Sequence, residues 1–272
     1  MKDKTIAIYV FIDDLLIKIG HKEPVSRTVF NSQIITTAIV AGMFFNGHME
    51  NAISFTSSLF TKTLGKSRFN RRLHAIYELI ITMFFRIAEA VKRINISSEY
   101  TIDSFPVSVC EKIRIWRSKI ITGEIYRGYK ASKRDYFYGF TVQVIATVDH
   151  VPVEFALLPG SIYDSKGMKS LFFNLPPGST VYGDSGYTDY TFEDEMKEAE
   201  DISLKIARKC NSKRKHEPWQ DYLISHYRKG IEPVFSQITG LFPKRIHAVT
   251  VEGFLLKVII FIIAYTFQKT IL

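Results

Sequence analysis

Apolar residues recur at helical spacing through the first third of the chain. A run from Leu73 to Val91 places them three or four residues apart, which is the period of one face of an α-helix. A second run of this kind follows Ser32 and continues to Phe44. The pattern predicts an all-helical region over residues 1–95.

The pattern changes after residue 96, where short β-type runs alternate with helical runs. The predicted strands include a hairpin that starts at Tyr136 and turns at Asp149-His150, and the single strands Tyr100–Phe105, Ser179–Asp184 and Ile202–Ala207. The predicted helices are Ser170–Asn174, Thr191–Ala199, Trp219–Ile238 and Gly253–Lys269. This alternation predicts an α/β domain over residues 96–272, with a mixed central sheet flanked by helices.

Two features of the sequence bear on the cellular location of the protein. The most apolar stretch, Val258–Tyr265, is shorter than the roughly 20 residues that cross a membrane, so we expect a buried helix. The two cysteines, Cys110 and Cys210, are a hundred positions apart, a spacing that argues against both a cysteine zinc site and a disulfide framework. A reducing cytoplasm fits this cysteine usage best.

The net charge of +9 and the sequence pI of about 9.4 favour an anionic partner, of which nucleic acid is the commonest. Charge alone leaves an ordinary basic protein equally open. Three basic segments are candidate DNA contacts: Lys66, Arg68, Arg71 and Arg72; Arg114, Arg117, Lys130, Lys133 and Arg134; and Arg208, Lys209, Lys213, Arg214 and Lys215. In the second segment, Trp116, Tyr126 and Tyr129 offer rings that stack on bases. The alternative for each segment is a solvated surface.

Three carboxylates are candidates for a metal site. Asp103 and Asp184 end two predicted strands, and Glu232 lies on a predicted helix, four residues after Arg228 and on the same helical face. Mg²⁺ prefers oxygen ligands, and two such ions clamp both oxygens of an in-line phosphodiester displacement. Aspartates at strand ends are also common for local hydrogen bonding. Asp164 competes as a ligand, so spacing alone leaves the set open.

The motifs around these residues resemble the DDE transposases of bacterial insertion sequences, and most closely the insertion-sequence 982 family. The similar segments are residues 67–74, 102–107, 136–140, 159–164 and 183–187, with Arg228, Ile231, Glu232, Phe235 and Ser236. The resemblance implies a ribonuclease H-like catalytic core in which Asp103, Asp184 and Glu232 hold two Mg²⁺ ions, replaceable by Mn²⁺. It also implies cleavage at element ends, followed by strand transfer.

The implied partners are double-stranded DNA, as terminal inverted repeats and target, and a second copy of the chain on that DNA. The implied location is the bacterial cytoplasm, in association with the nucleoid. Thr141, Gln143, Ser225 and Thr239 stand where many relatives carry Lys, His, Tyr and Lys, which puts auxiliary DNA contacts in question. Two alternatives remain: a nuclease on the same core that does not join strands, and a catalytically silent DNA-binding protein.

Overall fold

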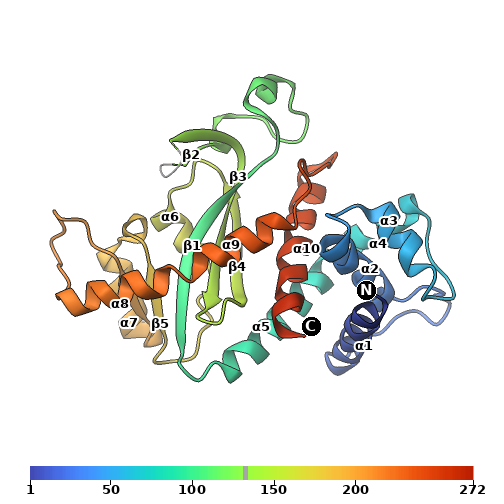
Figure 1. Cartoon of the computed structure of the whole chain (residues 1–272), viewed down its shortest axis with the longest axis horizontal. Coiled ribbons are helices and arrows are strands. Elements are labelled where there is room, and N and C mark those ends of the chain that lie inside the picture. Colours follow the sequence, from blue (N-terminus) through green and yellow to red (C-terminus); the bar gives the residue numbers. More distant parts are fainter. Residues whose placement is uncertain (131–133, 272) are drawn as a thin grey trace. The chain divides into compact units, whose positions relative to one another are not determined.

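The computed structural model describes residues 1–130 and 134–271, which form two compact units. One unit contains residues 1–86 and 237–272, and the other contains residues 87–236. The sequence predicted that residues 96–272 form one domain. In the structure, residues 237–272 pack instead with the N-terminal helices. Figure 1 shows the elements in chain order.

The first unit is helical. Its complete helices are α1 (Lys2–Lys18), α2 (Asn31–Phe44), α3 (Met49–Thr56), α4 (Lys66–Ala75) and α10 (Val251–Thr270). Helix α5 (Tyr77–Ile94) leads out of this unit, and α9 (Ile231–Gly240) leads back into it. The all-helical N-terminal region expected from the sequence is confirmed.

Helix α10 forms the centre of this unit together with α2. Both helices are apolar on nearly all sides, which is the pattern of a buried helix. A Cβ on Gly42 of α2 would lie 3.2 Å from Cβ of Ala264 on α10, so glycine lets the two backbones approach closely. Length and composition would also suit a membrane span, but 67% of the relevant window of α10 is buried inside the protein. The expected buried helix is confirmed.

The second unit contains a six-stranded sheet. Its strands are β1 (Glu99–Ser108), β2 (Arg127–Lys130), β3 (Asp135–Thr147), β4 (Pro152–Pro159), β5 (Thr180–Gly183) and β6 (Ser203–Ile206). Strand order is β2-β3-β1-β5-β6, with β4 also paired to β3. β3 pairs antiparallel with β1, β2 and β4, whereas β5 pairs parallel with β1 and β6. This mixed sheet confirms the predicted strands, hairpin and fold class.

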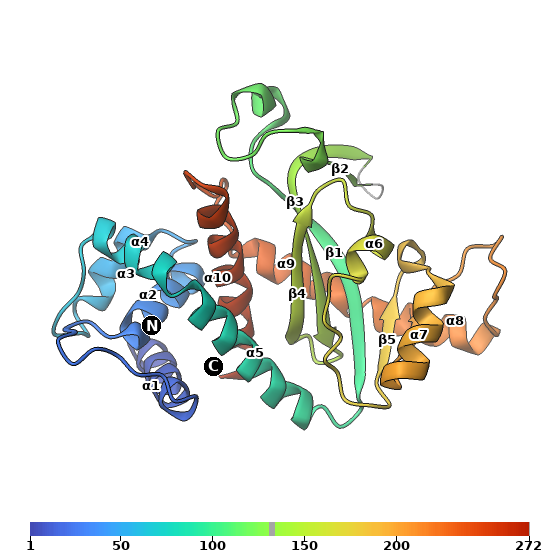
Figure 2. The same ribbon diagram turned by 180° about the vertical axis from the view of Figure 1, so that it is seen from behind.

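Helices cover both faces of the sheet. Helix α8 (Pro218–Arg228) lies across one face, in front of the sheet in Figure 1. Helices α6 (Asp164–Met168) and α7 (Tyr190–Glu200) lie on the other face, as Figure 2 shows from behind. Three short 3-10 helices complete the described elements: η1 (Lys112–Arg117), η2 (Glu124–Tyr126) and η4 (Ser185–Tyr187).

One predicted helix does not form, and another is divided in two. The segment Ser170–Asn174 is not helical, because Phe173 has a left-handed φ of 48° and its N–H donates to the buried Glu154 carboxylate. The long helix over Trp219–Ile238 is divided into α8 and α9. Pro233 explains the division, since a proline inside a helix removes a hydrogen bond and clashes with the carbonyl four residues earlier, whereas it is tolerated in a first turn.

Candidate active site

The pairing of β1 with β5 brings Asp103 and Asp184 together. In this parallel ladder Thr101 lies opposite Tyr182. Two residues further along each strand are Asp103, still within β1, and Asp184, directly after β5. The two carboxylates are close enough for the negative charge of Asp184 to raise the pKa of Asp103. The predicted position at a strand end is correct for Asp184 but wrong for Asp103, because β1 continues five residues further, to Ser108, in its pairing with β3. The sheet register nevertheless makes the two positions adjacent.

Asp103 carries the most perturbed carboxyl group of the site. Burial raises its pKa to about 7, and the negative charges of Asp184 and Asp164 act in the same direction. The N–H of Ser104, which donates to Asp103 Oδ1 at 2.7 Å, and the positive charge of Arg228 oppose this rise. A half-buried carboxyl with a strongly raised pKa beside other carboxylates is typical of a functional site, because a nearby cation favours its charged form.

Asp164 is the third carboxylate at this position. The Ser104 hydroxyl donates to Asp164 Oδ1 at 2.7 Å, and Gln143 Nε2 donates to its backbone carbonyl at 3.0 Å. Burial is the main cause of the raised pKa of Asp164. Gln143 is itself buried, and its hydrogen bond fixes the segment that holds Asp164.

Gly186 leaves a space between two of these carboxylates. A Cβ at residue 186 would lie 2.9 Å from Asp184 Oδ1 and 3.3 Å from Asp164 Oδ2. The N–H of Gly186 also donates to Asp184 Oδ1 at 2.6 Å. Any larger residue would push into the oxygens, so glycine preserves a small acidic cradle.

Tyr187 lies close to the carboxylates of Asp164 and Asp103. Its side chain is fully buried, and its hydroxyl has no hydrogen-bond partner among the residues that the structure describes. Burial first, and then the charges of Asp164 and Asp103, raise its pKa well above the ordinary value. Sequence reasoning included Tyr187 in a motif but gave it no role, because its proximity to Asp103 and Asp164 depends on the sheet register.

Arg228 reaches the site from the last turn of α8. Its Nη2 lies 3.8 Å from Asp184 Oδ2. The preceding residue, Tyr227, stacks on Tyr182 of β5 with ring centroids 4.5 Å apart, and the Tyr182 hydroxyl donates to Glu99. This stack positions the end of α8 over β5. The sequence predicted one helical face for Arg228 and Glu232, but α8 ends at Arg228 and Glu232 belongs to α9. The carboxylate beside Arg228 is that of Asp184.

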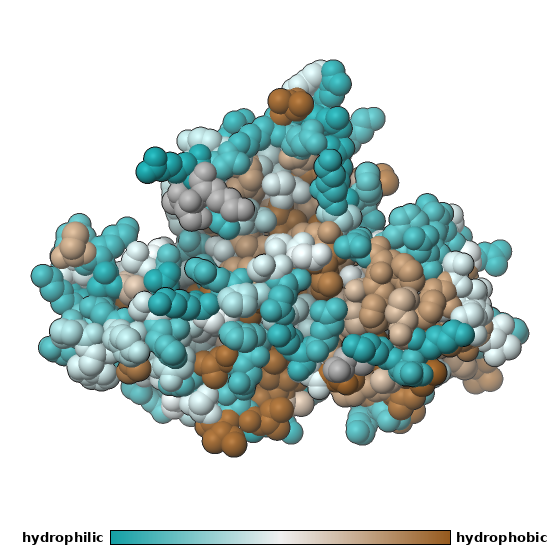
Figure 3. Space-filling view, viewed as in Figure 1, coloured by the Kyte–Doolittle hydropathy of each residue, from teal (hydrophilic) through white to brown (hydrophobic). Residues whose placement is uncertain are grey.

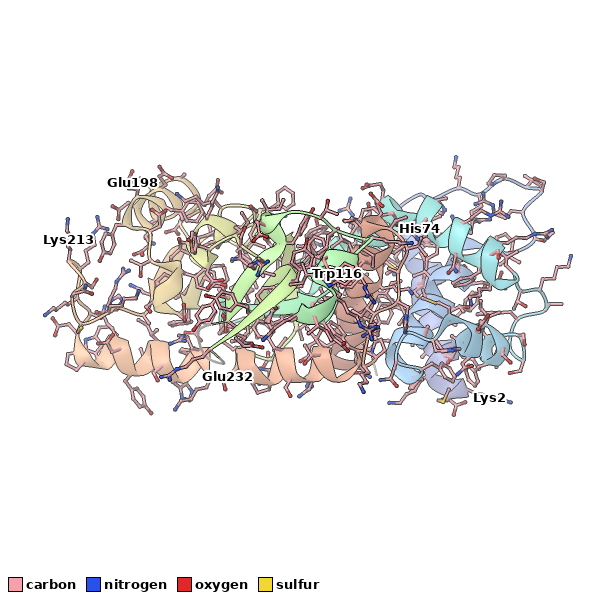
Figure 4. The ribbon with its side chains drawn as sticks, turned by 90° about the horizontal axis from the view of Figure 1, so that it is seen from above. Lys2, His74, Trp116, Glu198, Lys213 and Glu232 are labelled. Carbon is pink, nitrogen blue, oxygen red and sulfur yellow. The ribbon has the colours of Figure 1, made fainter. Side chains whose placement is uncertain are left out.

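Glu232 lies in the first turn of α9 and is exposed. It is labelled in Figure 4, where it lies at the junction of α8 and α9. One turn later, the ring of Phe235 packs on Phe105 of β1 at 4.8 Å, two residues beyond Asp103. The start of α9 is therefore anchored near the strand that carries Asp103.

The described residues contain no three Asp, Glu, His or Cys side chains close enough together to hold a metal ion. Convergence of Asp103, Asp184 and Glu232 on one metal pair therefore stays a prediction. The residues fit a hard divalent cation in two respects. The Gly186 cradle is lined by carboxylate oxygens, which such ions prefer. Burial, followed by the charges of Asp184 and Asp164, raises the pKa of Asp103, and a bound cation would offset both effects.

Comparison with known proteins identifies the family. Residues 97–267, more than half of the chain, match the model of the transposase DDE domain. The chain belongs to the DDE transposase family. No curated protein matches this transposase. A solved structure of a piggyBac transposase synaptic complex with hairpin DNA aligns with a TM-score of 0.48 and 11% identity, over 96% of this chain and 71% of that one.

Family membership confirms the expected enzyme class and implies use of a divalent metal ion.

The candidate DNA contacts of the transposase differ in how far they are exposed to solvent. Most are exposed: Lys66, Arg68, Arg71, Arg114, Arg117, Arg134, Lys209, Lys213, Arg214 and Lys215. Lys130 is half-buried, and Lys133 lies outside the described residues.

Two of the candidate contacts are engaged inside the protein. Arg72 donates to Asn31 Oδ1 at 2.6 Å and to Glu23 Oε2 at 3.2 Å. Arg208 forms a two-pronged pair with Glu193, and the side chains are only 7% and 8% exposed. Both arginines therefore have partners within the protein, so the exposed residues are the stronger candidates for DNA contact.

The segment between β1 and β3 remains a candidate nucleic-acid surface. The Arg117 guanidinium lies 4.1 Å from the Trp116 ring centre, and the Trp116 side chain is 75% exposed. Tyr129 and Tyr136 pair with ring centroids 4.8 Å apart across β2 and β3. Figure 3 shows this part of the surface as mainly hydrophilic with a hydrophobic side chain projecting from it.

Replacing Arg208 with Met is expected to destabilise the transposase by about 3–5 kcal/mol, because Glu193 would be left as a buried charge without its partner. The matched control is Lys209→Met at the adjacent exposed residue, which should change stability by less than about 0.5 kcal/mol. Urea denaturation measures both. Equal stability of the two variants would contradict the structural role of Arg208.

Proposed function

We propose that this DDE transposase cleaves DNA at the ends of an insertion element and joins the freed 3′-hydroxyl to target DNA, with Mg²⁺ as the metal. The observation that carries the proposal is the cluster of the half-buried carboxylates Asp103, Asp184 and Asp164 beside the paired strands β1 and β5. Such a cluster is unfavourable for folding alone, since burial and like charges both disfavour ionisation. Binding of a divalent metal ion would offset this repulsion, and the reaction would then use the bound metal.

Asp103, Asp184 and Glu232 are the residues proposed to hold two Mg²⁺ ions. When bound, the ions stabilise the attacking and leaving oxygens of an in-line displacement at phosphorus. The chain itself orients the ligands: the Ser104 N–H fixes Asp103, and the Gly186 N–H fixes Asp184. Arg228 supplies a positive charge beside Asp184, in reach of a phosphate that approaches from the α8 side.

Direct attack by water and then by the 3′-hydroxyl requires no covalent protein–DNA intermediate. The segments that carry exposed Arg and Lys side chains supply phosphate contacts, which position DNA without reading its sequence. The runner-up function, a nuclease, uses the same carboxylates but ends after attack by water. The transposase alone adds a second step, in which the freed 3′-hydroxyl attacks a phosphate of the target DNA.

The deciding assay uses a labelled DNA end and a supercoiled target plasmid, with Mg²⁺ or Mn²⁺. A transposase yields both the cleaved end and a product in which the label is joined to the plasmid. Cleavage without joining would favour the nuclease. If the protein binds the DNA end in chelator but never cleaves it with either metal, the proposal fails and the silent DNA-binding protein replaces it.

Asp164 and Glu232 compete for the third ligand position, and a pair of variants separates them. We expect Glu232→Gln to abolish cleavage at any Mg²⁺ concentration. We expect Asp164→Asn to retain cleavage but to need roughly tenfold more Mg²⁺, as for loss of an outer-shell partner, because the amide oxygen can still accept the Ser104 hydrogen bond. Mg²⁺ titrations of initial rate measure both. Active Glu232→Gln with inactive Asp164→Asn would assign the position to Asp164.

A further inference from the structure

The helical unit carries a hollow of about 860 Å³. Its walls are the loop at residues 46–48, the start of α3, one side of α4, the loop at residues 243–250 and the first turns of α10. All of these segments belong to the unit of residues 1–86 and 237–272. We refer to it as the α4–α10 hollow.

Positive charge dominates the lining of the α4–α10 hollow. The cationic residues are Lys66, Arg245 and Lys257, accompanied by the imidazoles of His48, His74 and His247. Glu50 is the acidic residue of the lining, and it is paired with Lys66 at 2.9 Å. The balance of the lining therefore favours an anion.

One face of α4 is directed to the hollow. Lys66, Asn70 and His74 are spaced by four residues and all line it, as residues on one helical face do. Phe69 and Leu73 are buried on another side, where they hold α4 in place. His74 is labelled in Figure 4. The basic segment predicted from sequence thus has one side that faces the hollow.

The N-terminus of α10 opens on the same hollow. Thr250 caps this helix by accepting a hydrogen bond from the Gly253 N–H at 3.1 Å, and both residues line the hollow. A Cβ on Gly253 would lie 3.2 Å from the His74 ring, so glycine allows His74 to lie against the first turn. The positive end of the helix dipole adds to the side-chain charges.

Lys257, one turn further along α10, is held at the wall by a hydrogen bond from its Nζ to the His247 carbonyl. Burial first, and then the charge of Lys66, lower the pKa of Lys257. An anion between these two cations would relieve their repulsion.

The hollow is also preformed. Gly47 has a φ of 77°, and a Cβ there would lie 2.7 Å from the Phe261 ring, so the loop at residues 46–48 packs tightly on α10. The adjacent Asn46 donates to the Leu241 carbonyl. A fixed wall lowers the ordering cost of binding.

We propose that the α4–α10 hollow binds backbone phosphates of DNA, as a contact made by the helical unit. The inference rests on the proposed function, in which DNA is the substrate. Its cations come from α4, from the loop at residues 243–250 and from α10. That spread suits a strand with a charge at every nucleotide better than a single small ion.

The test measures binding of a labelled duplex to the full chain in chelator, over a range of salt concentrations. Val249 lines the hollow and is 89% exposed, so Val249→Glu adds a negative charge without removing a contact. We expect it to weaken binding by roughly threefold or more. The control is Val25→Glu, at a fully exposed valine of the same unit outside the hollow, which should bind with nearly parental affinity.

A second variant combines Lys66→Gln with Arg245→Gln and should lower the salt slope by about one for each lost phosphate contact. Equal effects of Val249→Glu and Val25→Glu, or an unchanged slope, would overturn the proposal. If the parent still cleaves DNA with Mg²⁺ in that case, the proposed function stands. If tripolyphosphate raises the Tm of the parent while no hollow variant affects DNA binding, the hollow holds a small polyanion and the DNA contact is wrong.

Discussion

Replacement of Asp103 by Asn is expected to lower the rate of Mg²⁺-dependent DNA cleavage by at least about a thousandfold, since a catalytic metal supplies several kcal/mol of transition-state stabilisation. The amide keeps the shape of the side chain but removes the negative charge and one good metal-binding oxygen. DNA binding in chelator should be unchanged, because phosphate contacts come from basic residues elsewhere. Cleavage of a labelled DNA end and a gel shift measure the two properties separately.

The matched control is Asp221→Asn, which makes the same replacement at an exposed position in the first turn of α8. It should cleave at the parental rate. Asp184→Asn should show the same loss of cleavage as Asp103→Asn, with retained binding. An Asp103→Asn protein that cleaves as fast as the parent would show that Asp103 does not hold the metal.

The strands of the catalytic unit were predictable because their apolar patterns are local. Tyr100–Phe105, Ser179–Asp184 and Ile202–Ala207 overlap β1, β5 and β6. The helix breaks were less predictable, because they depend on where single residues act. Pro233 permits a new helix to begin but not the old one to continue, and the hydrogen bond of the Phe173 N–H with the distant Glu154 has no local signature.

The candidate site shows the same division between local and distant information. Apolar strand patterns identified Asp103 and Asp184 from the sequence, although β1 continues beyond Asp103, and the parallel register makes them neighbours. The roles of Gly186 and Tyr187 depend on where Asp164 lies in space. Charge counting could not separate Arg208, which is buried against Glu193, from its exposed neighbour Lys209. Only the structure shows that Arg208 is paired with Glu193 whereas the Lys209 side chain is exposed.

Without metal, the transposase is expected to lose stability relative to its Asp103→Asn variant as the pH rises from about 4 to 8. Burial raises the pKa of Asp103 to about 7 in the folded protein, whereas an unfolded Asp titrates near about 3.9. Between these values the folded state binds more protons than the unfolded state, so stability falls as the pH rises and levels off above the folded pKa. The Asn side chain does not titrate and escapes this loss.

We therefore expect Asp103→Asn to be more stable than the parent by on the order of 3 kcal/mol at pH 8 in chelator, with little difference near pH 4. Mg²⁺ should stabilise the parent at pH 8 and reduce the gap, because a ligand that binds only the folded state raises its stability. Urea midpoints at both pH values, with chelator or Mg²⁺, measure the effect. If the parent and Asp103→Asn have the same urea midpoint in chelator at pH 8, the charge of Asp103 does not destabilise the folded protein. If Mg²⁺ stabilises both proteins equally, the ion binds elsewhere.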